Sequence, residues 1–311
     1  MARYSIVIPC YRSSKTIEKV VALTAEELER LGLSDYEFVL VNDCSPDGGE
    51  TIAALYRLAD AHDYVKVVNL GKNAGPHNAT MAGLNYASGD FIISMDDDMQ
   101  TRPSEIIKLK TRMDEGFDIV FGYYEKKRES LFRRMGSALN SWTVRMLIHK
   151  PKWLKTSSFW IIRRYVRDYL IRDTHPDVHL QSLFLRTSSN IACVPIEHFA
   201  REVGTSTYTL KKLIKLYTNI VGFSSAPLNF LMVLGCVFAA GGLAADLVAL
   251  IVNLIRPEFH AVWTALFGTG FFLTGVLLAA MGLVGSYVSR IQMGQTQAPQ
   301  FVVRDLRNLE E

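Results

Sequence analysis

Two long apolar runs near the C-terminus restrict what this chain can fold into more than any other feature. They cover about residues 228–255 and 261–289. Each exceeds the roughly 20 residues that a helix needs to cross a bilayer. Only a short segment, 256–260, separates them. The pattern predicts a transmembrane hairpin over residues 227–290.

Basic residues indicate how this hairpin is oriented. They lie before the first span and after the second, whereas the turn carries a single one; the flanking residues are Lys211, Lys212, Lys215, Arg290, Arg304 and Arg307. The positive-inside rule then places both termini, with a tail of residues 291–311, in the cytoplasm. We expect a multi-pass protein of the inner membrane. Asp246, inside the first span, is expected to face another helix or the polar rim, and contact with a second subunit of a homo-oligomer stays open.

The first 206 residues alternate between predicted strands and predicted helices. This order indicates an α/β fold with a mixed, mostly parallel sheet covered on both faces. Ligands bind such sheets at the carboxyl ends of the strands. The net charge of +3 gives no reason to expect nucleic acid as a partner. The predicted strands cover 4–9, 36–41, 65–68, the stretch from Phe91, 117–121, 159–162 and 191–196, and the predicted helices cover 16–31, 49–62, 77–87, 135–148 and 163–171.

Three consecutive carboxylates, Asp96, Asp97 and Asp98, follow the buried stretch that starts at Phe91. Adjacent negative charges repel one another unless a cation lies among them. Hard divalent ions take carboxylate oxygens and keep positions open for phosphates. If the strand continues through the acids, Asp96 and Asp98 point one way and Asp97 the other. The alternative is an acidic turn that caps a helix after Pro103.

Other polar or glycine-rich segments follow the neighbouring strands. Asp43 could accept hydrogen bonds from a base or ribose, or could instead form an Asx turn with Ser45. The glycines of segment 71–75 allow close backbone approach to a phosphate or ribose, although GKNAG matches neither the Rossmann fingerprint nor a Walker loop. These segments are expected to meet at one edge of the sheet.

Residues 207–226 precede the first span and carry apolar residues at helical spacing, bordered by lysines. Such a basic amphipathic helix is typical of a segment lying in the headgroup plane of a membrane. A core helix of the soluble domain is the alternative.

The motifs together resemble the family-2 glycosyltransferases of GT-A (Rossmann-like) fold. The N-terminal half contributes IPCY, VNDCSPD, GKNAG and the aspartate triad, and the C-terminal half contributes REVGTS, the basic helix and the spans that end GSYVSRI. This layout is similar to that of the polyisoprenyl-phosphate glycosyltransferases, among them the aminoarabinose and bactoprenol glucosyl transferases and dolichyl-phosphate mannose synthases. The resemblance covers essentially the whole chain.

The resemblance implies roles for individual residues. Asp96 and Asp98 would form a metal-binding pair for Mg²⁺ or Mn²⁺, and Asp177 could orient the acceptor. Pro9, Tyr11 and Asp43 would hold the nucleoside, and Asn73 and Gly75 would line the nucleotide pocket. Asp97 would belong to the cofactor site, and Gln100 would lie near the metal pair or bind the metal. The lipid phosphate or the donor diphosphate would be held by Arg133, Arg201 and Ser206. Thr207 stands where the family usually has lysine, and segments 156–159 and 175–177 also depart from its pattern.

The activity that this resemblance implies is transfer of one hexose or aminosugar from a nucleotide-sugar to undecaprenyl phosphate. A UDP-sugar is the favoured donor, and the transfer would invert the anomeric carbon at the cytoplasmic face of the membrane. A polysaccharide synthase subunit is one alternative, although two spans are few for a translocation channel. A membrane-tethered nucleotide-sugar-binding protein without turnover is the other.

Overall fold

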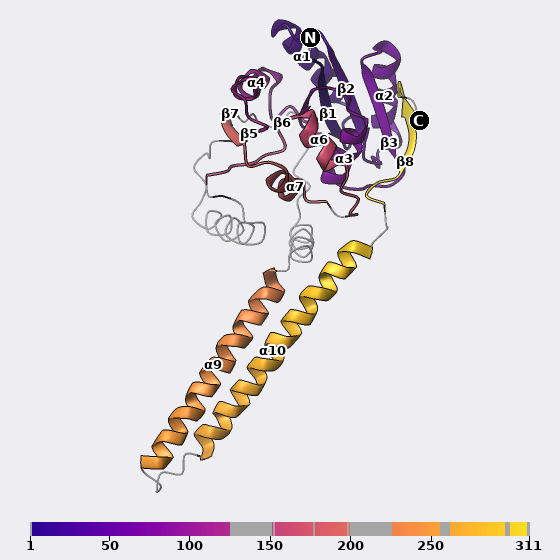
Figure 1. Cartoon of the computed structure of the whole chain (residues 1–311). Helices are drawn as coiled ribbons and strands as arrows, with labels where there is room; N and C mark the ends of the chain where they lie inside the picture. Colours follow the sequence, from indigo (N-terminus) through magenta and orange to yellow (C-terminus); the bar gives the residue numbers. More distant parts are fainter. Residues whose placement is uncertain are drawn as a thin grey trace. The chain divides into compact units, whose positions relative to one another are not determined.

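The computed structural model describes residues 2–124, 151, 153–176, 178–197, 199, 226–255, 262–295 and 299–309. The described residues divide into two units (Figure 1). The sheet unit holds every strand of the described residues, including one from the C-terminal tail, and the hairpin unit holds two long helices. The predicted helices at 135–148 and within 207–226 lie outside the described residues.

The sheet unit is an α/β structure around one mixed, mostly parallel sheet, as the sequence predicts. The strands are ordered β7-β5-β6-β4-β1-β2-β3-β8. Among these, β6 and β8 run antiparallel to their neighbours. The strands are β1 (Tyr4–Cys10), β2 (Tyr36–Asn42), β3 (Val65–Leu70), β4 (Phe91–Ser94), β5 (Ile119–Tyr124), β6 (Trp160–Arg163), β7 (Ile191–Ile196) and β8 (Val303–Arg307).

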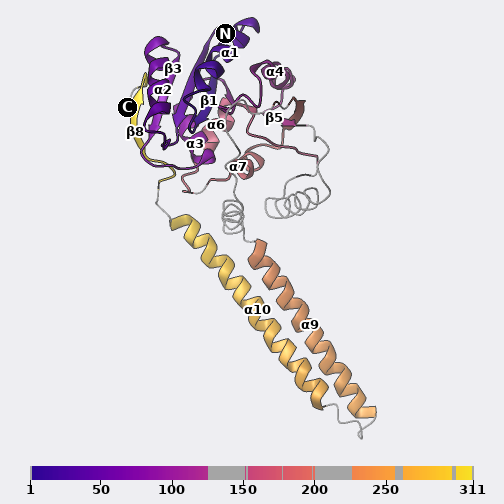
Figure 2. The same cartoon turned by 180° about the vertical axis from the view of Figure 1, so that it is seen from behind.

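Helices cover both faces of this sheet (Figure 2). One face carries α1 (Ile17–Arg30), α2 (Glu50–Ala61) and α4 (Ile106–Asp114), which a 3-10 turn, η1 (Pro103–Glu105), precedes. The other face carries α3 (Pro76–Tyr86), α6 (Arg164–Leu170) and α7 (Leu180–Thr187). Both faces are therefore protected from water, as a parallel sheet requires.

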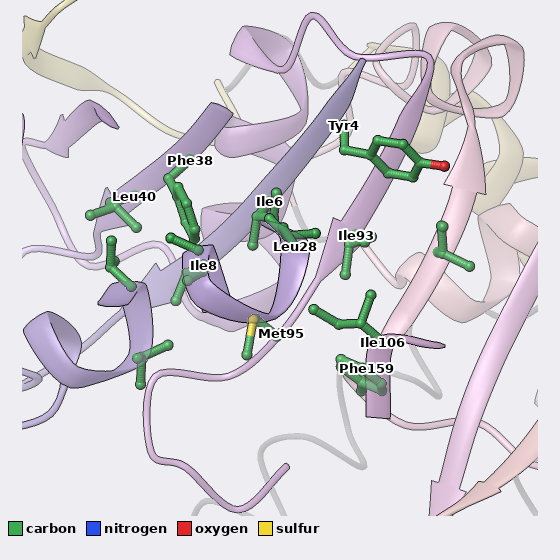
Figure 3. Packing of buried hydrophobic residues seen from close by; sticks show 14 of the residues in the cluster. Tyr4, Ile6, Ile8, Leu28, Phe38, Leu40, Ile93, Met95, Ile106 and Phe159 are labelled. Atoms are coloured by element: carbon green, nitrogen blue, oxygen red, sulfur yellow. The ribbon is translucent and has the colours of Figure 1, made fainter. Parts of the chain in front are cut away.

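Alternation along β1 explains why the core has two halves. Ile6 and Ile8 belong to the cluster on the α1 face, with Leu28 and Phe38 (Figure 3), whereas Val7 belongs to the cluster on the α3 face. Successive side chains of a strand point to opposite faces, so an almost uninterrupted apolar strand supplies both halves. Each buried aliphatic side chain contributes roughly 1.5–3 kcal/mol through burial.

The C-terminal tail contains a strand that the sequence did not predict. Residues 303–307 pair antiparallel with β3, and Asn69 lies opposite Asp305. The segment VRDLR is short and mostly charged, so its periodicity carries almost no strand signal. Its pairing with β3 covers an edge of the sheet that would otherwise expose unpaired backbone groups.

The hairpin unit consists of α9 (Ala226–Ile255) and α10 (Val262–Gln295). Stretches of 26 and 24 residues within them are long and apolar enough to cross a membrane. Only 17% and 11% of their most apolar windows are buried, which is opposite to what a core helix of a soluble protein shows. Most of their apolar surface therefore lacks a protein partner within the described residues.

Glycines let these two helices approach closely. A Cβ at Gly235 would lie 2.5 Å from the backbone nitrogen of Ala279, and one at Gly242 would lie 2.4 Å from that of Phe272. Close backbone contact through small residues is typical of packing between membrane helices. Asp246 faces α10, where its Oδ2 accepts a hydrogen bond of 3.1 Å from the hydroxyl of Thr269.

Candidate active site

The carboxyl ends of β1, β2, β3 and β4 meet at one edge of the sheet, and hydrogen bonds join their loops. The backbone N–H of Asp43, after β2, donates to the carbonyl of Cys10 in β1 at 3.0 Å. The N–H of Tyr11, after β1, donates to Oδ2 of Asp97, after β4, at 3.1 Å. Residues far apart in the sequence are thus held together at this edge, which includes Pro9, the penultimate residue of β1.

Asp43 is buried and holds the glycine-rich loop that follows β3. Its Oδ1 accepts from the N–H of Ala74 at 2.6 Å, and its Oδ2 accepts from the N–H of Gly75 at 3.1 Å and from Nδ2 of Asn73 at 2.9 Å. Burial raises the pKa of Asp43, and the two backbone N–H groups partly offset that rise. The first task of this carboxylate is therefore to shape the loop.

Gly75 allows the loop to lead into α3. Its φ of +85° lies in the region that side chains disfavour, and Pro76 then starts the helix. The first turn of α3 thereby follows directly on the loop that Asp43 holds, and free N–H groups at a helix start can bind phosphate.

The three acids lie beyond β4, which ends at Ser94, so they follow the strand in a turn and do not continue it. The turn is completed by Met99, whose φ is +61°. Asp97 points back to the loop after β1, where it also accepts a hydrogen bond from the hydroxyl of Ser13. Desolvation raises the pKa of Asp97, against the hydrogen bonds from Ser13 and Tyr11.

The charges of Asp96 and Asp98 act on Tyr124, at the end of β5. Burial raises the pKa of Tyr124, a hydrogen bond with Thr101 opposes the rise, and the charges of Asp96 and Asp98 add to it. The hydroxyls of Thr101 and Tyr124 are 2.6 Å apart. The hydrogen bonds that Asp97 accepts lead to the loop after β1, whereas Asp96 and Asp98 act on Tyr124, and this difference arises in a turn and not from strand alternation.

Two further contacts define the surroundings of these acids. The hydroxyl of Ser158, which precedes β6, donates to Asp96. The backbone N–H of Gln100 donates to Oδ1 of Asp98 at 3.1 Å. Gln100 thus contacts the acids through its backbone, and the role of its side chain stays a prediction.

The donor set of this edge suits a hard divalent ion. Asp96 and Asp98 supply carboxylate oxygens, which Mg²⁺ and Mn²⁺ prefer. Within the described ranges, no cluster of three or more His, Cys, Asp or Glu side chains is arranged to hold a metal by itself. A two-carboxylate site of this kind fits an ion whose remaining ligands come from substrate phosphates and water.

The chain has strained backbone at the same edge. Arg12, Cys44 and Met99 have φ values of +60°, +48° and +61°, a region that costs a non-glycine residue roughly 1–2 kcal/mol. Each follows one of the strands β1, β2 and β4 closely. Such residues persist where their surroundings hold them, and they gather at ligand sites.

Four of the predicted residues lie outside the described residues: Asp177, Arg133, Arg201 and Ser206. The structure therefore brings together the nucleotide and metal candidates and leaves the phosphate candidates as predictions. Ser13, Ser158, Thr101 and Tyr124 were not predicted. Serine, threonine and tyrosine are common everywhere, and only the fold shows that Ser13 and Ser158 bond the acids and that Thr101 bonds Tyr124.

Residues 5–171 match the model of the family described as glycosyl transferase family 2. The chain is also 31% identical over 313 aligned positions to undecaprenyl-phosphate 4-deoxy-4-formamido-L-arabinose transferases of Salmonella paratyphi B and Salmonella enteritidis. Each alignment covers 98% of this chain and 93% of the relative.

Solved structures share the fold at lower identity. Glucosyl-3-phosphoglycerate synthase from Mycobacterium tuberculosis, in complex with Mn²⁺, UDP and phosphoglyceric acid, has a TM-score of 0.52 and 19% identity. The match covers 71% of this chain and 76% of the synthase. The same enzyme with Mn²⁺ and UDP-glucose has a TM-score of 0.50 at 18% identity, over 71% and 77% of the two chains. The likeness agrees with a GT-A fold for the sheet unit.

Proposed function

The chain belongs to glycosyltransferase family 2, and from this premise we propose that it transfers a single sugar from a nucleotide-sugar to undecaprenyl phosphate. One observation carries the proposal. Similarity to transferases named for that acceptor extends over 98% of the chain, and so includes the apolar hairpin as well as the sheet. An enzyme that acts on a lipid carrier needs both parts.

The donor would bind at the edge formed by the ends of β1 to β4. Asp43 holds loop 73–75 there, at the start of α3, in a position to receive the nucleotide. Tyr11 is 42% exposed at the same edge, so its ring is open to a base. A UDP-sugar is the favoured donor, because the solved relative of the same fold was crystallised with UDP.

Asp96 and Asp98 would hold Mg²⁺ or Mn²⁺ against the diphosphate of the donor. When bound, such an ion neutralises negative charge on the leaving nucleoside diphosphate. Hydrogen bonds from Ser158 and from the N–H of Gln100 would orient the carboxylates of Asp96 and Asp98. Asp97 would hold the turn against the loop after β1.

The acceptor requires little help from a base. The second pKa of a phosphomonoester is about 6, so its oxygen is already largely ionised at neutral pH. That oxygen attacks the anomeric carbon, the bond from this carbon to the diphosphate breaks, and the nucleoside diphosphate leaves with the electron pair. A direct displacement of this kind inverts the anomeric centre.

Bringing two anions together is the harder task, and we assign it to cations. Arg133 and Arg201 suit it, because a guanidinium binds phosphate through two parallel hydrogen bonds. Ser206 would add a hydroxyl to the same phosphate, and Asp177 would orient the acceptor. These four roles rest on the sequence motifs.

The hairpin would place the reaction at the inner membrane. The exposed apolar surfaces of α9 and α10 suit lipid, and the basic segment 207–226 precedes α9 in the sequence. With the basic flanks inside, both termini are cytoplasmic, which is where nucleotide-sugars are available.

The test uses the full chain in bilayers with undecaprenyl phosphate, a panel of labelled nucleotide-sugars, and Mg²⁺ or Mn²⁺. We expect a labelled glycolipid that depends on both the acceptor and the ion. Asp98→Asn should abolish that product while the protein stays in the membrane and retains its melting temperature. Full activity of this variant would refute the metal assignment, and nucleotide binding without any glycolipid would refute the transfer.

A further inference from the structure

The C-terminal tail reaches the nucleotide edge of the sheet. In β8, Asp305 lies opposite Asn69 of β3, and the carbonyl of Val302 accepts a hydrogen bond of 2.8 Å from the N–H of Gly71. Gly71 begins the loop that Asp43 holds. The tail therefore contacts β3 and its loop directly, although it follows the second long helix in the sequence.

A continuous chain of hydrogen bonds starts at Asp305. Asn69 donates from Nδ2 to Oδ2 of Asp305 at 2.8 Å, and Asn42 donates from Nδ2 to Oδ1 of Asn69 at 2.8 Å. Oδ1 of Asn42 accepts from the hydroxyl of Ser45 at 2.7 Å and from its N–H at 3.3 Å. Finally, the N–H of Arg12 donates to Oγ of Ser45 at 3.1 Å. We call these five residues the tail relay.

The carboxylate of Asp305 fixes how the amides of Asn69 and Asn42 are oriented in the tail relay. An ionised carboxylate can only accept hydrogen bonds, so Asn69 must present its NH₂ group to Asp305 and its oxygen to Asn42. Asn42 must then present its NH₂ group to Asn69 and its oxygen to Ser45. The two asparagines are 7% and 5% exposed, so a reversed amide would leave buried groups unpaired at a cost.

The relay ends beside two of the strained residues. Ser45 follows Cys44 and its hydroxyl holds the N–H of Arg12, and both Cys44 and Arg12 have positive φ. Arg12 is next to Tyr11, and Cys44 is next to Asp43. Because strained backbone persists only where its surroundings hold it, fixing Ser45 also fixes the two loops that carry Tyr11 and Asp43.

We propose that Asp305 is a positioning residue for the nucleotide site, acting through Asn69, Asn42 and Ser45 on the loops after β1 and β2. The inference rests on the proposed function, because it assumes that a nucleotide binds at this edge. It assigns a role to a residue of the tail that lies beyond both long helices in the sequence. Tyr56 fixes the other oxygen of the carboxylate by donating its hydroxyl.

Other contacts keep the tail docked when Asp305 is replaced. Arg307 pairs with Asp60 at 2.8 Å, Asn308 donates to the carbonyls of Ala59 and Val65, and Gln300 donates to the carbonyl of Asp173. Arg307→Ala is therefore the control for docking of the same strand: the side chain of Arg307 lies over the ring of Tyr56, and its hydrogen bonds go to Asp60 and not to the five residues of the relay.

The experiment measures nucleotide binding by full-length protein in detergent, by calorimetry with Mn²⁺ present. The probe is whichever of UDP, dTDP, CDP and GDP binds the wild-type protein most tightly. We expect Asp305→Ala to raise the Kd of the probe about tenfold, and the KM of the matching nucleotide-sugar similarly, with kcat changed less than twofold. Asp305→Asn should raise the Kd only two- to threefold, because its amide oxygen can still accept from Asn69. Arg307→Ala should stay within twofold of wild type.

The possible outcomes separate the two proposals. If the wild-type protein binds none of the four diphosphates, the proposed function fails. If wild type binds and Asp305→Ala stays within twofold, the positioning role is wrong. An equal loss in Arg307→Ala would also overturn it, because general docking of the tail would then be responsible. Should Asp305→Ala fail to fold, Ser45→Ala breaks the relay at its other end, and an unchanged Kd in that variant would contradict the role.

Discussion

Replacing Asp43 with asparagine tests how the nucleotide edge is organised. The carboxylate accepts three hydrogen bonds from loop 73–75, whereas an asparagine offers one oxygen and one NH₂ group. The orientation that costs least keeps the oxygen toward Gly75 and Asn73. The NH₂ group then faces the N–H of Ala74, so one bond to a charged acceptor is lost and two donors oppose each other.

The size of the effect follows from that lost bond. A hydrogen bond to a charged group contributes about 1.5–3 kcal/mol. Gly71, Lys72 and Asn73 are exposed, and the remaining bonds of the loop, from Gly71 to Val302 and from Asn73 to the carbonyl of Asp43, do not reach Ala74. Binding a nucleotide must then supply the missing free energy, and we expect Asp43→Asn to weaken binding roughly 10- to 150-fold.

The assay is titration of the full chain with the preferred nucleoside diphosphate, alongside a thermal melt. Asp47→Asn is the matched control, because Asp47 lies in the same connection but accepts from the N–H of Thr51 at 3.1 Å and from its hydroxyl, in α2. That control should lose about 1 kcal/mol of stability and keep its affinity. A folded Asp43→Asn variant that binds within twofold of wild type would show that the reasoning is wrong.

Two further predictions concern stability. Burial alone would raise the pKa of Glu37, but hydrogen bonds from Lys66, Ser5 and Ser88 outweigh it and lower the pKa from 4.5 to about 2. The ionised form therefore stabilises the fold by about 3 kcal/mol above pH 4.5, and this is lost as pH falls toward 2; Glu37→Gln should flatten the pH dependence of urea unfolding across that interval, and an unchanged slope would contradict the assignment. In the hairpin, Gly242→Ala would place a Cβ 2.4 Å from the backbone of Phe272, whereas nothing lies within 4 Å at Gly241. Gly242→Ala should speed proteolysis of the hairpin in detergent and Gly241→Ala should not; equal resistance would argue against close helix contact.

The architecture of the sheet unit could be predicted from the sequence because it depends on the spacing of apolar residues. The runs at 4–9, 36–41 and 65–68 are apolar on both faces, which only a covered parallel sheet accommodates, and they correspond to β1, β2 and β3. The strand β8 could not be predicted from the sequence, because the segment VRDLR is extended through its pairing with the edge strand β3 and has no strand pattern of its own.

The functional site could be predicted from the sequence only in part. Acids and glycines at strand ends are rare enough to notice, so Asp43, Gly75 and Asp96 were identified as candidates. The structural role of each of these residues could not be predicted. Asp43 turned out to hold a loop, and the three acids lie in a turn that Met99 closes, since one left-handed residue leaves no mark in the sequence.

The mass of the lipid product tests the central claim most directly. Purified full-length protein in bilayers would receive undecaprenyl phosphate, Mn²⁺ and the nucleotide-sugar that it binds best, and the lipids would be analysed by mass spectrometry. We predict a single new species, heavier than undecaprenyl phosphate by one glycosyl residue, with an equal amount of nucleoside diphosphate released. A ladder of heavier species, or nucleoside diphosphate released without any new lipid, would contradict transfer of one sugar to this carrier.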